Sequence, residues 1–140
     1  MHAALVALCL ALWSHLSPGL EVQGDARAVA EAIATAVERD GARAPVTESH
    51  AGDAALLAYY AALESGLHVH PRAWSWDARA GVSVGPWQLR RELAEGRGLA
   101  EQAASWLALA RAGGIAGVDS SPSRAERRGR RARALLAGAL

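Results

Sequence analysis

Glu64 is the residue of this sequence whose type and position best suit acid–base chemistry. It ends an apolar, Ala-rich run that begins at Ala54, and Ser65-Gly66 follows it directly. A carboxyl group that is partly buried near the negative end of a helix dipole has a raised pKa, so it can carry a proton near neutral pH and donate it in glycoside cleavage. The position therefore predicts a general acid, and leaves open a surface Glu at a frayed helix end.

A second group of candidate residues lies in the segment 81–89, Gly-Val-Ser-Val-Gly-Pro-Trp-Gln-Leu. Its alternation predicts a short hairpin. Gln88 carries an amide that can donate and accept hydrogen bonds to hydroxyl or acetamido groups without neutralising an acid. Gly81 and Gly85 suit bends where the backbone approaches a sugar, and equally suit ordinary turns. Trp87 can offer a ring face to a sugar or pack in a core.

Glu64-Ser65-Gly66 and Gly81–Leu89 together resemble the catalytic Glu-Ser and the Gly-Leu-Met-Gln segment of the lytic transglycosylase and goose-type lysozyme families. The resemblance covers roughly a fifth of the chain. It implies a lysozyme-like α+β domain, mostly helical, with a short β-hairpin at the cleft, and cleavage of the glycan strand of peptidoglycan without cofactor or metal. It makes Glu64 the general acid; the residues implied to bind substrate or shape the cleft are Ser65, Ser83, Gly85, Trp87 and Gln88.

The sequence departs from the family pattern in two places. Pro86-Trp87 stands where the family has Leu-Met, and no tyrosine follows Tyr60, whereas the family supplies a cleft tyrosine from a later Tyr-Asn-Ala-Gly segment. The product, an anhydro or a reducing end, therefore stays open. Asp77 could position a water for hydrolysis, and it equally suits a turn-capping role.

Other aromatic and imidazole side chains are further candidate ligands. Trp74 and Trp76 are either a sugar platform or core, whereas the spacing of Trp106 with Ala103 and Ala110 predicts core. His68 and His70 would share one side of an extended strand, but no third ligand accompanies them, so we expect no metal site.

The composition predicts a single domain, and its near-zero net charge predicts no strong overall electrostatic field. The chain has 140 residues, 51% of them hydrophobic, and a net charge of +1, so it can bury a core. Cys9 is alone and cannot form an intrachain disulfide. The apolar segment Ala3–Trp13 is too short to span a bilayer and suits a signal-peptide core or a buried first helix. We therefore separate residues 1–24 from a domain over 25–140. The resemblance implies a monomer acting on peptidoglycan in the cell envelope or with a phage.

Local patterns predict the helices around Glu64. Asp25 should cap a helix carrying Val29, Ile33 and Val37, and a loop should occupy 39–52. Asp53 should cap a buried central helix that ends at Gly66. Later patterns predict a helix from Leu99 that stops at Gly113-Gly114, a capping box formed by Ser123 and Glu126, and an apolar anchor at Leu135-Leu136.

The last helix concentrates positive charge in six arginines: Arg124, Arg127, Arg128, Arg130, Arg131 and Arg133. Such a helix can bind nucleic acid or an acidic partner, or it can be a solvated face with one buried structural Arg. The second interpretation is favoured because no base-reading motif accompanies the arginines, so we expect no nucleic-acid partner. An Arg-rich binding module and a catalytically inactive glycan-binding module remain the two alternatives to an enzyme.

Overall fold

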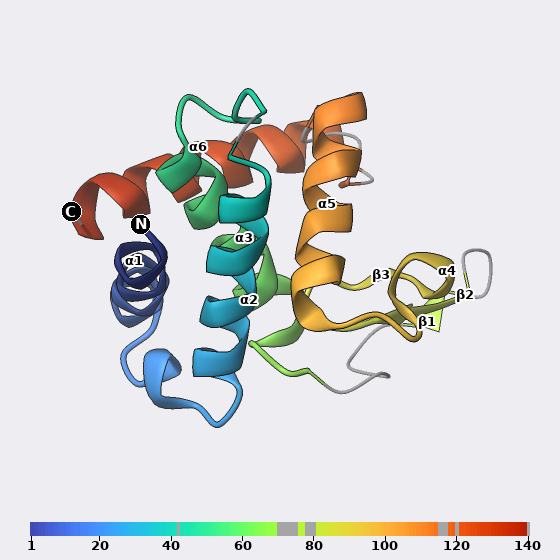
Figure 1. The fold of residues 1–140 in the computed structure, drawn as a ribbon, viewed down its shortest axis with the longest axis horizontal. Helices are drawn as coiled ribbons and strands as arrows, with labels where there is room; N and C mark the ends of the chain where they lie inside the picture. The colour runs from blue at the N-terminus through green and yellow to red at the C-terminus, as the bar shows by residue number, and fades with distance from the viewer. Residues whose placement is uncertain (42, 70–75, 78–80, 115–117, 120, 140) are drawn as a thin grey trace.

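The protein is mostly helical and carries a small antiparallel sheet, as the sequence predicts (Figure 1). The computed structural model describes residues 1–41, 43–69, 76–77, 81–114, 118–119 and 121–139. The elements in chain order are α1 (His2–Leu16), the 3-10 turn η1 (Leu20–Val22), α2 (Ala26–Arg39), α3 (His50–Ser65), β1 (Trp76–Asp77), β2 (Gly81–Val84), β3 (Leu89–Arg90), α4 (Arg91–Ala94), α5 (Leu99–Gly113) and α6 (Pro122–Ala139).

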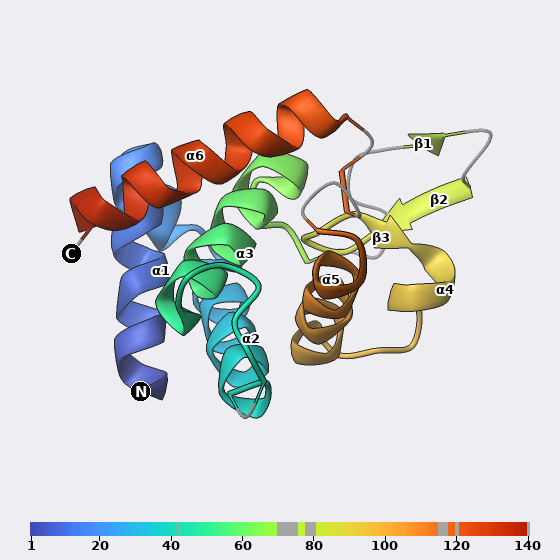
Figure 2. The same ribbon diagram turned by 90° about the horizontal axis from the view of Figure 1, so that it is seen from above.

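The helices form one packed body, and the sheet lies at its edge. Helix α1 packs on α2, α3 and α6, and α2 packs on α5. Figure 2 shows α6 crossing α1 and α3, while α5 separates these helices from the sheet and α4. The strands follow the order β1-β2-β3, with Trp76 opposite Val82 and Val84 opposite Leu89. The sheet thus lies at the edge of the helical body, and its side chains Val84 and Leu89 join the buried core.

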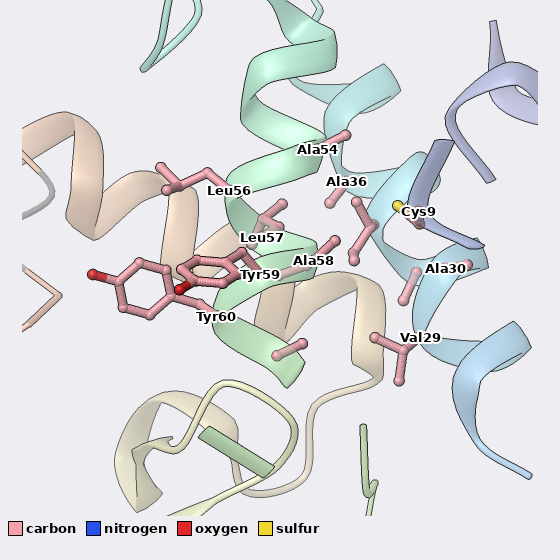
Figure 3. Close-up of a cluster of buried hydrophobic side chains, with 14 of the residues drawn as sticks. Cys9, Val29, Ala30, Ala36, Ala54, Leu56, Leu57, Ala58, Tyr59 and Tyr60 are labelled. Atoms are coloured by element: carbon pink, nitrogen blue, oxygen red, sulfur yellow. The ribbon is translucent and has the colours of Figure 1, made fainter. Parts of the chain in front are cut away.

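Helix α3 is the central helix, as predicted. Every residue from Gly52 to Ala61 is buried, and the small side chains of Ala54 and Ala58 lie towards Ala30 and Ala36 of α2 (Figure 3). Small side chains on both surfaces let two helix backbones approach closely, and apolar burial on all sides stabilises the contact. The helix ends at Gly66, which adopts the left-handed conformation at φ 60° as the sequence predicted.

The predicted cap of α3 at Asp53 is wrong. The helix begins at His50, and Ser49 is the cap, with its hydroxyl accepting a hydrogen bond from the Gly52 N–H at 2.9 Å. Asp53 lies in the first turn, where its buried carboxylate accepts the N–H groups of Val46 and Thr47. The carboxylate therefore ties the preceding loop to the helix, because a buried charge is stable only when its oxygens are bonded.

The caps of two other helices also differ from the prediction. Asp25 stands at the start of α2, but its carboxylate accepts the Val69 N–H at 3.3 Å and makes no cap bond. Helix α6 begins at Pro122, and the Ser121 hydroxyl accepts the Arg124 N–H at 3.3 Å. The proline suits the first helical position because it has no N–H to satisfy. Ser121 thus replaces the predicted Ser123, and Glu126 bonds Arg130 instead of closing a capping box.

The apolar N-terminal segment lies inside α1 and belongs to the core. Its buried side chains include Cys9 and Trp13, both with no exposed surface, and the Trp13 indole N–H donates to the Ala58 main-chain oxygen at 2.9 Å. Among the described residues, none of the helices combines the length and apolar character that crossing a bilayer requires. Trp106 of α5 is buried as predicted, and Leu135 anchors α6.

Candidate functional site

Glu64 lies in the last turn of α3, where the buried part of the helix gives way to solvent. Its side chain is 31% exposed. The next residue, Ser65, is buried and donates its hydroxyl to the Ala61 main-chain oxygen at 2.9 Å, so it bonds its own helix. Because Tyr60 lies four residues earlier and is also buried, Glu64 shares a helix face with the core and is only partly open to solvent.

Arg128 of α6 holds the Glu64 carboxylate. Its Nη1 donates to Glu64 Oε1 at 2.7 Å and to Asp119 Oδ2 at 3.4 Å. The Arg128 side chain is 19% exposed, and its Cζ lies 5.1 Å from the centroid of the Tyr60 ring. A guanidinium over an aromatic face gains a further attraction. The solvated-face interpretation expected one buried structural arginine; instead Arg124 and Arg128 are both partly exposed and both bond Asp119, while Arg127, Arg130, Arg131 and Arg133 are exposed.

Asp119 is the buried carboxylate behind Glu64, with 1% of its side chain exposed. It accepts bonds from Arg124 Nε at 2.9 Å, the Ser121 N–H at 3.1 Å and the Tyr60 hydroxyl at 3.0 Å. Burial alone would raise the pKa of Asp119, but these donors together outweigh burial and hold the pKa below its usual value. Burial, and then the bond to Asp119, raise the pKa of Tyr60, so its hydroxyl stays a neutral donor.

The hairpin is docked onto the same helix through Trp87. This side chain is 3% exposed, and its indole N–H donates to the Leu57 main-chain oxygen at 2.9 Å. A buried ring whose polar atom is already bonded cannot offer its face to a sugar. The expectation that Trp87 binds substrate is thus replaced by a packing role, since a Trp with a matched acceptor gains more from burial than from exposure.

The hairpin also carries three further candidate residues, Ser83, Gly85 and Gln88. Gln88 is partly exposed at φ 49°, and its side-chain amide donates to the Gly85 main-chain oxygen at 2.8 Å. Gly85 is buried at φ 78°, and a Cβ there would lie 2.0 Å from Gln102 Oε1. Gly85 is therefore required by a tight turn and by the close approach of Gln102, whereas Gln88 and Ser83 are partly exposed.

Of the remaining candidate ligands, most lie partly or wholly outside the described residues. Asp77 and Trp76 are described only as the backbone of β1, and Trp74 and His70 lie outside the described residues. His68 is exposed. In the described part of the chain no group of three or more His, Cys, Asp or Glu side chains could hold a metal ion.

A hollow of about 590 Å³ opens beside the hairpin; Val84 and Gly85 of the family-like segment line it, but Glu64 does not. Its walls come from β2, α4 and the start of α5; the lining residues are Val69, Val84, Gly85, Arg91, Ala94, Glu95, Gly96, Arg97, Gly98, Leu99 and Gln102. Glu64, Ser65 and Gln88 are not among them. We keep the candidate site at Glu64, the residue that both its position at the helix end and the family resemblance indicate, because a hollow alone does not define a chemistry.

Comparison of the chain with protein-family models, curated proteins and solved structures finds no match. Only the arrangement of the residues themselves therefore indicates a function.

Sequence reasoning missed the partnership of Asp119 and Arg128. One local signal could have indicated Arg128: it lies three residues after Ala125 and four before Ala132, two buried positions of α6, so a helix places all three on one face. No comparable pattern indicates Asp119, which lies in the connection before α6.

Proposed function

We propose that this protein cleaves the glycan strand of peptidoglycan on a lysozyme-like fold, with Glu64 as general acid and base. The observation that carries the proposal is the placement of Glu64: a carboxyl that is 31% exposed at the end of a buried helix and bonded by Arg128 at 2.7 Å. Trp87 docks the hairpin on that same helix. A rigid, accessible carboxyl beside a fixed wall is what proton transfer to a bound sugar requires.

The reaction has two steps in which one group acts twice. Protonated Glu64 first gives its proton to the glycosidic oxygen while the bond between that oxygen and the anomeric carbon breaks. The resulting carboxylate then takes a proton from the group that attacks the anomeric carbon. That group is either the muramyl hydroxyl of the same sugar, which gives an anhydro end, or water, which gives a reducing end.

Other residues have supporting parts in the proposal. Gln88 and Ser83 would contact hydroxyl or acetamido groups from the hairpin, where both are partly exposed. Asp77 would position the water if the product has a reducing end. The proposed partner is the glycan strand alone, without a cofactor, and the chain would act as a monomer in the envelope or with a phage.

A non-catalytic glycan-binding module is the second candidate, and one contact favours it. The Glu64 carboxylate is bonded to a guanidinium, and a carboxylate in such a pair has to exchange that partner for a proton before it can act as an acid. A protein that used the pair only to hold α6 on α3 would bind wall material without cutting it.

Digestion of purified peptidoglycan, followed by mass spectrometry of the released fragments, separates the candidates. We expect the wild type to release fragments and Glu64→Gln to release essentially none while keeping its circular dichroism spectrum. Glu126→Gln is the matched control, because Glu126 is 73% exposed and bonds only one arginine, Arg130, among the described contacts. If wild type and Glu64→Gln both bind wall material and neither releases fragments, the non-catalytic candidate is correct.

A further inference from the structure

Behind Glu64 lies a group of charged side chains that the proposed reaction does not use, formed by Tyr60, Asp119, Arg124 and Arg128. We infer that Arg128 is a positioning residue for Glu64, and that Asp119 is the second anion that retains Arg128 when Glu64 takes up a proton. The inference deepens the proposed function and rests on it for its catalytic meaning. It also concerns the protonation of Glu64 in the free protein, which can be measured whether or not the protein cleaves glycan.

Contacts from three directions fix the Arg128 guanidinium. It donates to Glu64 at 2.7 Å and to Asp119 at 3.4 Å, and it lies 5.1 Å from the centre of the Tyr60 ring. The shorter of the two bonds shows that Arg128 binds Glu64 more closely than Asp119 in this structure. The longer bond places a buried carboxylate within reach as the second partner. Arg128 can therefore exchange one anion for the other with a small movement.

The charges of this group balance when Glu64 is ionised, and one anion, Asp119, remains for the two guanidinium groups when Glu64 is protonated. With Glu64 ionised, two carboxylates face two guanidinium groups, since Arg124 also bonds Asp119. When Glu64 is protonated, Arg124 and Arg128 both retain Asp119. Without Asp119, a neutral Glu64 would leave Arg128 largely buried and unpaired, which is strongly unfavourable. Asp119 thus makes the protonated form of Glu64 compatible with the fold.

Tyr60 keeps Asp119 in place for this exchange. Its hydroxyl donates to Asp119 Oδ2, the same oxygen that faces Arg128. Because the pKa of Tyr60 is raised and that of Asp119 lowered, the first remains a donor and the second an acceptor while Glu64 changes its protonation. Among the described residues, the charged and titratable groups bonded to Glu64 or to its partner include Arg128, Asp119, Tyr60 and, through Asp119, Arg124.

Two substitutions should move the titration of Glu64 in opposite directions. Arg128→Gln removes a neighbouring cation and favours the neutral carboxyl, so the titration midpoint should move up relative to the wild type. Asp119→Asn removes a neighbouring anion and leaves both arginines to Glu64, so the midpoint should move down. If these residues had a purely structural role, the two substitutions would not move the titration midpoint of Glu64 in opposite directions.

The test measures the ¹³C carboxyl signal of Glu64 against pH, with the signal assigned by its loss in Glu64→Gln. Arg130→Gln is the control, because Arg130 is 56% exposed and bonds Glu126 on its own helix; it should leave the midpoint unchanged. If Arg128→Gln does not fold, Arg128→Lys replaces it, and its midpoint should lie above that of the wild type, because the lysine side chain is shorter and holds its charge farther from Glu64 than Arg128 Nη1 does. A midpoint equal to that of the wild type in the tested Arg128 variant, or an upward shift in Asp119→Asn, would overturn the inference.

Activity gives a second, separate readout. In a cleaving enzyme, Arg128→Gln should lower kcat by about 10- to 100-fold through loss of orientation, with KM nearly unchanged, and should move the high-pH limb of the rate upward. Arg128→Lys should restore part of kcat. Absence of cleavage by the wild type would refute the proposed function without touching the titration, which alone decides whether Arg128 and Asp119 control Glu64.

Discussion

The Trp87 indole N–H and the Leu57 main-chain oxygen are 2.9 Å apart, and this bond attaches the hairpin to the helix that carries Glu64. Trp13 makes the same kind of bond to the next carbonyl along the helix, that of Ala58. Two tryptophans from distant parts of the chain therefore fix α3 through consecutive residues, one from α1 and one from the hairpin.

Trp87→Phe should lower the free energy of unfolding by about 1–2 kcal/mol, because it removes the bond to Leu57 and part of the buried area. Urea denaturation measures this change. The matched control is Trp13→Phe, which loses the corresponding bond to Ala58 on the α1 side. We expect similar losses of stability in both, but a loss of glycan cleavage at a temperature where both are folded only in Trp87→Phe. Equal activity of the two variants would show that the hairpin position does not matter to the site.

Gly85→Ala should destabilise the protein by more than Gly96→Ala does. Both glycines have positive φ, 78° and 74°, so each substitution has a cost of about 1 kcal/mol for the left-handed backbone. At Gly85 the new Cβ would also meet Gln102 Oε1, whereas at Gly96 nothing lies within 4 Å. Overpacking should add about 1–3 kcal/mol at Gly85 alone. Thermal denaturation of the two variants compares them; equal midpoints would contradict the close approach of Gln102.

Cys9 should react with alkylating reagents only when the protein unfolds. It is the single cysteine of the chain and has no exposed surface, and burial raises the pKa of its thiol to about 12. The thiolate is the reactive form, so both access and ionisation oppose reaction in the folded state. Mass spectrometry after iodoacetamide treatment should detect almost no label in buffer and complete label in concentrated urea. Fast labelling in buffer would mean that α1 leaves the core readily.

His2 should make the attachment of α1 to α2 depend on pH. Its imidazole bonds Glu31 and Glu38 of α2, and the bond to Glu31, followed by that to Glu38, raises the pKa of His2. A raised folded-state pKa stabilises the fold fully below the ordinary value of about 6.5, and this contribution is lost as pH rises through the folded-state value. Relative to His2→Gln, the wild type should therefore lose stability as the pH rises above about 6.5, through the raised pKa of His2. Urea midpoints across that range measure the difference; parallel curves for the two proteins would exclude the effect.

How far the sequence predicts this structure depends on whether a feature is local. Gly66 ends α3 and Gly113-Gly114 ends α5 as predicted, because a glycine after an apolar helical run fixes a helix end by itself. The caps at Asp53 and Ser123 were wrong because nearby serines compete for the same N–H groups, and the choice depends on the chain before the helix. The role of Trp87 is ambiguous in the sequence for another reason. A tryptophan ring can stack on a sugar or pack in a core, and only its bond to the Leu57 carbonyl, which is distant in sequence, shows that it packs in the core. The pairing of Arg128 with Glu64 has no local pattern at all.

The bond between Glu64 and Arg128 joins positions 64 residues apart. Asp119 and Arg124 also belong to the last part of the chain, and α6 rests on α1 and α3, which are synthesised long before it. A contact that spans so much of the chain forms only after the intervening loop has closed, which makes it a late event in folding. The carboxyl of Glu64 is therefore without its fixed partner while the chain is being made, and the final helix completes the site.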